Sequence, residues 1–343
     1  MIDPPHVERP YRREAGVFAA MLGVALLAVL VLTVGGGSGG PRAVVSFWDG
    51  EPIEPEATSV ASQGDVPSLL PVVAFRAEER PTTEEILRAA APLAQFAPAA
   101  AAMAERSEIA PSVAIVDVRD GAVYSYDGDR DHNLLSVAKV PILLATVEEA
   151  IREERPLTDA ERRWLGWMIS VSDNAATEYL WEGLGGSGPV DRLFREAGLP
   201  APQFALEARW GTMRASALEV AWLLAAMVSG DLVEEETRQI ALELLDQVDE
   251  QQRWGVSAHL DDDGGCECLV RLKNGWFQVE DAWWLRSAGV VYGADGRAAY
   301  ALVVMTDVAQ SFAGGVAAIE AIAGAIHLAD RAEARLGSIA AGG

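Results

Sequence analysis

After an apolar N-terminal segment, the pattern of apolar positions predicts two strands, a helical middle, three further strands and a final helix. Two apolar-rich runs, residues 112–118 and 122–126, are separated by Arg119-Asp120-Gly121, and this arrangement predicts a β-hairpin. Further apolar runs at 269–272, 282–292 and 298–306 predict three more strands. Two predicted strands therefore precede the middle of the chain and three follow it.

The middle of the chain has the apolar spacing of helices. We expect helices at 136–153, 159–181, 189–197, 215–228 and 234–247, and a closing amphipathic helix at 316–329. A Thr cap followed by acidic residues, in Pro81-Thr82-Thr83-Glu84-Glu85, predicts the start of the folded domain. This order predicts an α/β fold of the α+β type, in which helices flank an antiparallel β-sheet and an all-helical subdomain is inserted between its halves.

The N-terminal segment has the length of a membrane span. Residues 16–34 are an uncharged, largely apolar run, long enough to cross a bilayer as a helix. Arg9, Arg12 and Arg13 precede this run and favour the cytoplasmic side, which puts the rest of the chain outside. A cleaved secretory signal is the alternative, and either would export the domain. The predicted organisation is a cytoplasmic N-terminus (1–15), a single-pass signal-anchor in the cell membrane (16–34), an extracytoplasmic stalk (35–81), the folded domain (82–330) and a tail (331–343).

The charge balance is strongly acidic, with 27 basic and 51 acidic residues and a formal net charge of −24. Nucleic acids and anionic lipid headgroups are bound through clustered Lys and Arg. This composition therefore argues against a nucleic-acid partner. The oligomeric state cannot be predicted from the sequence.

The two cysteines of the chain, Cys266 and Cys268, are separated by one residue. A disulfide across one residue would be strained, so we expect no disulfide framework. His259 and the aspartates at 261–263 lie close enough to suggest a metal site, but an acidic, Gly-containing loop accounts for the same residues. We expect neither a metal nor another cofactor.

A serine and a lysine stand one helical turn apart in Ser136-Val-Ala-Lys139. At a helix start both side chains lie on one face, and an amine of lowered pKa can take the proton of a serine hydroxyl. The backbone N–H groups of the same helix start point at any oxyanion that forms near Ser136. The alternative is that this Ser-x-x-Lys pattern occurs by chance and that the serine only caps a helix.

Two further clusters follow. Ser172-Asp173-Asn174 falls between predicted helices, where it can relay a proton and hold an amide, or simply cap a helix. Lys273-Asn274-Gly275 falls on a predicted strand, where a lysine can attract a carboxylate and a glycine allows close approach of a substrate. A hairpin turn at Asn-Gly is the alternative there.

In this order, the three clusters resemble the layout of class A β-lactamases and penicillin-binding proteins. The resemblance covers about residues 82–329 and includes the flanking sequences Leu134-Leu135 and Ile169-Ser170-Val171. It implies a β-lactamase/transpeptidase-like fold in which Ser136 is the nucleophile, Lys139 its base and Ser172 the proton relay. It also implies a substrate-binding and oxyanion set made of Asn174, Lys273, Asn274, Gly275 and Trp276.

Three features depart from the family pattern. Asn274 stands where the family has Thr or Ser, which changes the reach and angle of a hydrogen bond to a carboxylate. Ser136 and Ser172 are only 36 residues apart, so one rim of the cleft is expected to be more open. The segment 204–214 is too short for the loop that carries the deacylating glutamate of class A enzymes, and Glu207 is its only nearby acid.

These observations predict an exported, membrane-anchored serine hydrolase that is acylated at Ser136 by a β-lactam or a cell-wall peptide amide. Without a deacylating base, the acyl-enzyme should persist. A D-Ala-D-Ala carboxypeptidase-like penicillin-binding enzyme is one alternative. A degenerate fold that binds cell wall or protein is the other. A Ser-His-Asp mechanism is not expected, because none of the four histidines stands in an obvious nucleophile context.

Overall fold

We describe the fold from a computed structural model of the 343-residue chain, covering residues 82–205, 208–260 and 268–341. Contacts divide the chain into two units, Met1–Leu70 and Pro71–Gly343, and all of the described residues belong to the second. The predicted membrane anchor at 16–34 and the stalk at 35–81 lie outside the described residues. The domain boundary at residue 82 stays a prediction.

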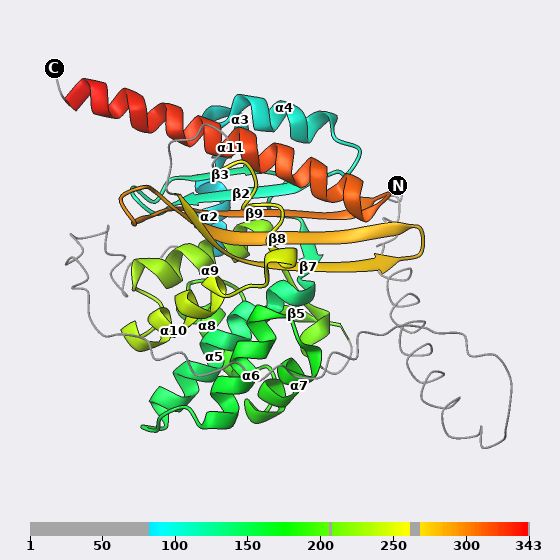
Figure 1. Cartoon of the computed structure of the whole chain (residues 1–343), viewed down its shortest axis with the longest axis vertical. Helices are drawn as coiled ribbons and strands as arrows, with labels where there is room; N and C mark the ends of the chain where they lie inside the picture. Colours follow the sequence, from blue (N-terminus) through cyan, green and yellow to red (C-terminus); the bar gives the residue numbers. More distant parts are fainter. Residues whose placement is uncertain (1–81, 206–207, 261–267, 342–343) are drawn as a thin grey trace, which may run out of the picture. The chain divides into compact units, whose positions relative to one another are not determined.

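A six-stranded sheet with the strand order β1-β3-β2-β9-β8-β7 forms the centre of the fold (Figure 1). Its pairs are antiparallel except for the short parallel contact between β1 and β3. The strand β7 is an edge of this sheet, so one side of β7 is free of a neighbouring strand. The strands are β1 (Ala91–Pro92), β2 (Ser112–Asp117), β3 (Val123–Tyr126), β7 (Leu269–Val279), β8 (Ala282–Tyr292) and β9 (Ala298–Ala309).

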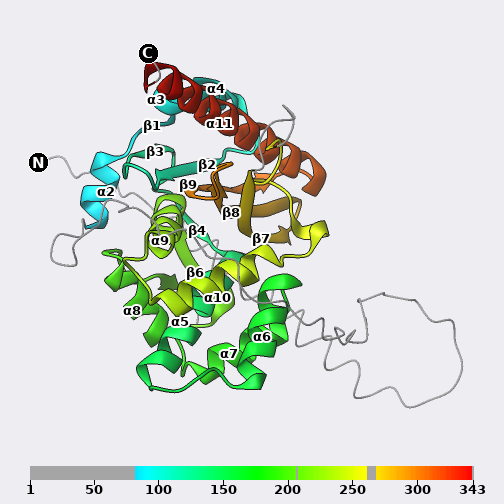
Figure 2. The same ribbon diagram turned by 60° about the vertical axis from the view of Figure 1, so that its left-hand side comes forward.

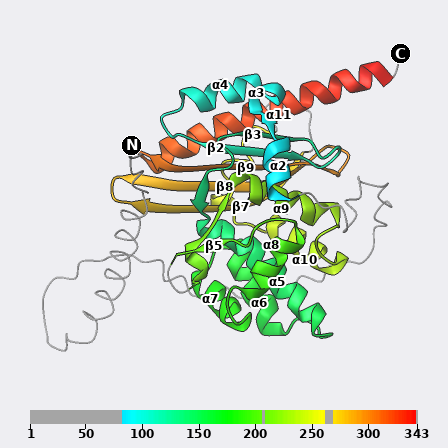
Figure 3. The same cartoon turned by 180° about the vertical axis from the view of Figure 1, so that it is seen from behind.

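Helices cover both faces of the sheet, as the views in Figures 2 and 3 show. The helices α3, α4 and α11 pack on one face, and α9 packs on the other against β2, β8 and β9. The helices α5 to α8 and α10 form a helical layer beyond α9 (Figure 1). The helices are α2 (Thr83–Ala89), α3 (Leu93–Phe96), α4 (Pro98–Arg106), α5 (Lys139–Arg152), α6 (Asp159–Ser170), α7 (Asn174–Gly183), α8 (Gly188–Glu196), α9 (Ala217–Ser229), α10 (Glu235–Asp246) and α11 (Phe312–Ala341).

The local signals in the sequence account for most of these elements. Thr82 caps α2 in a reciprocal capping box with Glu85, as the sequence predicts. The predicted hairpin forms between β2 and β3, with Val113 opposite Tyr126. The helix α9 is apolar on nearly all sides, which is typical of a helix buried between two layers. The α/β fold with a helical insertion is therefore observed in the described part of the chain.

Some elements differ from the predictions. A second sheet, with the order β4-β6-β5, is built from short segments that the apolar pattern does not mark: β4 (Asp131–Asn133), β5 (Gln203–Phe204) and β6 (Met213–Ser216). The predicted helix at 215–228 therefore begins at Ala217, after β6. The strand β7 runs to Val279, so Asn274-Gly275 lies inside a strand and makes no turn.

One described helix has the length and hydropathy of a membrane span, Phe312–Glu333 in α11. Its Ile319, Ile322 and Ile326 are fully or almost fully buried, and the helix packs on β8 and β9. A core helix of this kind passes the same length and hydropathy test as a membrane helix. We therefore interpret α11 as the helix that covers one face of the sheet.

Candidate active site

Ser136 lies in η1 (Leu135–Ala138), a short 3-10 helix that leads directly into α5. The residue before it, Leu135, has a φ of +51°, in the left-handed region that is unfavourable for a side chain other than glycine. The Asn133 side chain stabilises this conformation, because its Oδ1 accepts the Leu135 N–H at 2.8 Å. Ser136 itself is half-buried, whereas the two residues after it are fully buried.

Lys139, one turn later, is fully buried, and its amine contacts the loop between α6 and α7. The Nζ atom donates to the Ser172 carbonyl oxygen at 2.5 Å, to the Ser172 Oγ at 3.0 Å and to the Asn174 Oδ1 at 2.9 Å. Ser172 is held with a φ of +60°. Asp173 caps α7 through a hydrogen bond from the Ala176 N–H. The first two predicted clusters therefore meet at one amine.

The electrostatics of this amine favour its neutral form. Burial, and to a smaller extent repulsion from Lys273, lower the pKa of Lys139 to about 6, and Asp173 opposes the shift. A lysine with a pKa near 6 carries a free electron pair at neutral pH. Such an amine can accept a proton from a nearby hydroxyl.

The third cluster approaches Ser136 from the edge strand β7. A Cβ atom on Gly275 would lie 2.8 Å from the Ser136 backbone nitrogen and 3.0 Å from the Leu135 Cβ. Real Cβ atoms do not make such a contact, so only glycine fits here without a shift. Gly275 therefore brings β7 into direct contact with the Ser136 turn.

Side chains alternate between the two faces of β7. Lys273 is on the same face as Gly275 and is fully buried, and burial lowers its pKa to about 7. Its Nζ donates to the Asn274 carbonyl oxygen at 2.9 Å. Among the described residues it makes no ion pair with a carboxylate, so it has N–H groups left for an anion.

Asn274 is on the opposite face of β7, and this revises its predicted role. Its Nδ2 donates to the carbonyl oxygens of Gln252 and Trp254, at 2.8 and 2.9 Å. An amide nitrogen has two hydrogens, so Asn274 has no donor left for a substrate carboxylate in this arrangement. Trp276 is on the same face, where its ring packs edge-on against Trp254 and Phe312. Its main-chain role in an oxyanion hole stays a prediction.

Comparison with known proteins relates this arrangement to a family. The profile of the Beta-lactamase enzyme family matches residues 162–329, which contain the second and third clusters but not Ser136. The structure of PBP-A matches with a TM-score of 0.59 and 19% identity, over 70% of this chain and 97% of that one. A class A β-lactamase from Bacteroides cellulosilyticus matches with a TM-score of 0.57 and 17% identity, over 67% of this chain and 95% of that one. The chain therefore has the fold of these proteins, and its residues 162–329 match the Beta-lactamase enzyme family.

A third structure shows chemistry within this fold. It is a mutant of PBP-A, solved as an acyl-enzyme complex with penicillin G. It matches this chain with a TM-score of 0.58 and 20% identity, over 70% of this chain and 97% of that one. No curated protein matches the sequence of the chain. At these identities the structural likeness shows the fold, and the site must be argued from its own residues.

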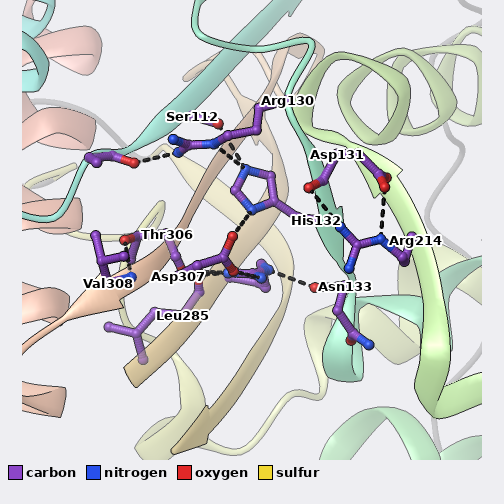
Figure 4. Close-up of polar contacts among 12 residues, drawn as sticks. Ser112, Arg130, Asp131, His132, Asn133, Arg214, Leu285, Thr306, Asp307 and Val308 are labelled. Atoms are coloured by element: carbon purple, nitrogen blue, oxygen red, sulfur yellow. Dashed lines mark hydrogen bonds and ion pairs between the residues drawn. The ribbon is translucent and has the colours of Figure 1, made fainter. Parts of the chain in front are cut away.

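Ser112, His132 and Asp307 also lie in a row, in which the first two are fully buried and the Asp307 side chain is 34% exposed (Figure 4). The His132 Nε2 is 2.8 Å from the Ser112 Oγ, and the His132 Nδ1 is 2.7 Å from the Asp307 Oδ2. Ser112 and His132 are fully buried, so no substrate reaches this hydroxyl. Burial lowers the pKa of His132, and the neutral imidazole joins β2, β4 and β9.

Arg286 connects this row to the Ser136 turn. It is fully buried, contacts Asp307 and the Thr306 carbonyl oxygen, and donates through Nε to the Asn133 carbonyl oxygen at 2.8 Å. Arg286 and His132 hold the pKa of Asp307 well below its usual range, although burial opposes this. Arg286, paired with the partly exposed Asp307, therefore supports the strand that leads to the nucleophile turn.

Two residues at the site escaped the sequence analysis. Trp210, in η2 (Trp210–Thr212), places its ring centroid 5.4 Å from the Lys139 Nζ. Its indole nitrogen donates to the Glu178 Oε2 at 2.7 Å. Trp210 belongs to the segment 204–214, which the sequence analysis compared with the glutamate loop of class A enzymes, and only that location pointed to it. Glu207 lies outside the described residues.

The cysteine prediction was wrong. Cys268, which directly precedes β7, is disulfide-bonded, and Cys266 is the only other cysteine in the sequence. Cys266 and the acidic residues 261–263 lie outside the described residues. In the part of the chain that the structure describes, no group of His, Cys, Asp and Glu side chains could hold a metal ion.

Proposed function

We propose that this β-lactamase relative is a serine hydrolase that is acylated at Ser136 by a β-lactam or a cell-wall peptide amide. The contacts of Lys139 carry the proposal. A buried amine, with a pKa lowered to about 6, follows a half-buried serine by one turn and contacts the Ser172 hydroxyl. Among the described residues Lys139 makes no ion pair with a carboxylate, and a lysine buried in this way costs stability, which is typical of an amine with a chemical role.

In the proposed acylation, the proton of the Ser136 hydroxyl moves to the neutral Lys139 amine as the Ser136 Oγ bonds to the carbonyl carbon. The carbonyl oxygen becomes an oxyanion, which the backbone N–H groups of Ser136 and Trp276 would stabilise. The carbon–nitrogen bond then breaks. The leaving nitrogen takes a proton from the Ser172 Oγ, which regains one from Lys139 across 3.0 Å.

Recognition would rest on the two polar residues that keep free donors. Lys273 would attract an anionic group of the substrate, and the Asn174 side chain, on the exposed first turn of α7, would hold an amide. Gly275 allows the substrate to lie along the free edge of β7. No donor of Asn274 takes part in this scheme.

Deacylation is proposed to be slow. The segment between β5 and β6 places Trp210 beside Lys139, and among its described residues there is no acid that contacts Lys139 or Ser136. An acyl-enzyme without a base to activate water persists. Export and membrane anchoring are also proposed, from the apolar run at residues 16–34.

A chromogenic cephalosporin tests this proposal. The full-length chain should give a colour burst of about one equivalent, followed by turnover that is slow compared with the burst, as expected when acylation outpaces deacylation. Ser136→Ala should abolish the burst. Fast, linear hydrolysis without a burst would contradict the slow-deacylation part of the proposal.

The position of Asn274 favours a second candidate function. Because its amide is bonded to the loop at 252–254, the site has one donor fewer for a substrate carboxylate than the family pattern implies. This is compatible with a carboxypeptidase-like enzyme with another substrate preference, or with a module that only binds cell wall. Binding to isolated cell wall that survives Ser136→Ala, with no burst in the unmodified chain, would favour the module.

A further inference from the structure

Trp210 covers the side of the Lys139 amine where the class A resemblance would place a water-activating loop. Its ring centroid lies 5.4 Å from the Lys139 Nζ. The ring is half-buried, so one side of it faces the protein and part of it faces solvent. An indole in this position occupies space that water would otherwise fill next to the amine.

The turn that carries Trp210 is fixed to the Ser136 turn. The 3-10 helix η2 packs against η1, and the Asn133 Nδ2 donates to the Gly211 carbonyl oxygen at 3.1 Å. Within η2, the Thr212 Oγ1 and N–H both bond to the Arg209 carbonyl oxygen. The same Asn133 side chain therefore holds the residue before the nucleophile and the residue after Trp210.

Glu178 supplies the second attachment of the ring. It is exposed on α7, four residues after Asn174 and hence on the same face of the helix. Its Oε2 accepts the indole N–H of Trp210 at 2.7 Å, which is the length of a strong hydrogen bond to a charged acceptor. Trp210 is thus bonded to one helix of the site and packed over the amine of another.

We propose that Trp210, held in place by Glu178, keeps hydrolytic water away from an acyl group on Ser136 and so sets the lifetime of the acyl-enzyme. This inference rests on the proposed acylation of Ser136. Hydrolysis requires a water oxygen to bond to the acyl carbon, its proton to pass to the Lys139 amine, and the Ser136 Oγ to leave and regain a proton. With the ring in place, water has no room beside Lys139. Trp210 and Glu178 are positioning residues in this scheme.

The lifetime of a penicillin adduct on the full-length chain, followed by intact mass, tests the proposal. Trp210→Ala should shorten the lifetime by roughly ten-fold or more, because water reaches the acyl carbon and the amine together. Glu178→Ala should shorten it by about two- to five-fold, the scale of a single exposed polar contact. Trp210→Phe keeps a ring but loses the N–H that Glu178 accepts. Its combination with Glu178→Ala should therefore shorten the adduct lifetime no more than either change alone.

Matched variants separate the hydrogen bond from charge. Glu178→Gln keeps an oxygen that can accept the indole N–H, so it should retain more of the unmodified lifetime than Glu178→Ala. Glu182→Ala removes the same charge one turn further along α7, at an exposed position, and should leave the lifetime unchanged. Shortening by Glu182→Ala to the same extent as Glu178→Ala would mean that charge, and not the contact with Trp210, is responsible.

A second readout does not need acylation. Lys139 and Lys273 are the only lysines in the sequence, so lysine labelled with ¹³C at Cε gives two side-chain signals, which Lys273→Arg assigns. The Lys139 signal should titrate near pH 6 in the unmodified chain and at higher pH in Trp210→Ala, because water then solvates the charged amine. If the Trp210 ring mainly attracts the charged Lys139 amine, the shift has the opposite direction, because loss of the ring would then lower the titration midpoint of Lys139.

The two readouts distinguish the failure of this inference from the failure of the proposed function. A chain that takes no acyl group refutes acylation at Ser136, while the NMR titration still decides whether the ring keeps water from Lys139. If the titration midpoint of Lys139 is unchanged or lowered in Trp210→Ala, the Trp210 ring does not keep water from Lys139, and the proposal is wrong. An unchanged adduct lifetime in Trp210→Ala would contradict the proposal as well.

Discussion

Replacement of Gly275 by alanine tests the closeness of the edge strand β7 to the nucleophile turn. The added Cβ would lie 2.8 Å from the Ser136 nitrogen, 3.0 Å from the Leu135 Cβ and 3.3 Å from the Leu134 carbonyl oxygen. Two of these atoms belong to the backbone, so no side-chain rotation relieves the contact. Either β7 or the Ser136 turn must move.

The size of the movement follows from these distances. An ordinary contact begins at 3.4 Å, so the nearest pair must separate by about 0.6 Å. Misplacement of a catalytic group by about 1 Å can cost about 100-fold in rate, so we expect acylation to slow by roughly 10- to 100-fold. Overpacking should lower the free energy of unfolding by about 1–3 kcal/mol.

The assay is the second-order rate constant for acylation by a fluorescent penicillin, measured beside urea unfolding of the same preparation. Gly166→Ala is the matched control, because a Cβ at this position of α6 meets nothing within 4 Å. That change should leave acylation unaltered and raise stability by up to about 1 kcal/mol, through the better helix propensity of alanine.

The result that would refute this reasoning is a folded Gly275→Ala variant that is acylated at the unmodified rate. Such a result would mean that β7 does not lie against the Ser136 turn in solution. A slower rate in Gly166→Ala as well would show that the assay reports general disturbance and not the contact at Gly275.

Three further predictions concern pH and the buried amides. The acylation rate should rise with pH through about 6, as Lys139 loses its proton. For a substrate with a carboxylate, the rate should fall above about pH 7, as Lys273 loses its charge. A stopped-flow pH profile that is flat from pH 5 to 8 would contradict both assignments. Asn274→Ala should lower the free energy of unfolding by about 1–3 kcal/mol in urea, because two carbonyl oxygens lose their donor, and an unchanged stability would contradict that role. Asn133→Ala should lower the free energy of unfolding by about 1–2 kcal/mol and also slow acylation, since the Leu135 N–H loses its acceptor. A loss of stability with an unchanged acylation rate would contradict a positioning role for Asn133.

The elements that the sequence predicts are those whose signal is local. The hairpin of β2 and β3 has an Asp-Gly turn between apolar runs, and the start of α2 has a capping box. The second sheet has no comparable signal, because β4 and β5 contain only three and two residues. Such short strands form because their neighbours position them, and their own composition does not mark them.

The candidate site divides in the same way. Ser136, Lys139 and Ser172 are recognisable because the first two are one turn apart and the third stands in a short motif. The orientation of Asn274 was also accessible, because strand alternation places it on the face opposite Lys273 and Gly275. The contact of Trp210 with Glu178 joins residues 32 positions apart, and no spacing rule links them.

The row of Ser112, His132 and Asp307 shows most clearly what the sequence does not predict. His132 is 175 residues from Asp307 and 20 from Ser112. Pairing of β2 with β9 brings Ser112 near Asp307, whereas His132 comes from β4 of the second sheet. The geometry of this row resembles a catalytic triad, yet the full burial of Ser112 and His132 excludes a substrate. Only the structure supplies both facts.

Intact mass of the full-length chain, before and after addition of a penicillin and beside Ser136→Ala, tests the central claim most directly. The account predicts one adduct per chain that carries the full mass of the drug, decays slowly and is absent from Ser136→Ala. No adduct on the unmodified chain, together with no loss of drug, would contradict acylation of Ser136 by this class of substrate. An adduct that persists in Ser136→Ala would contradict Ser136 as the nucleophile.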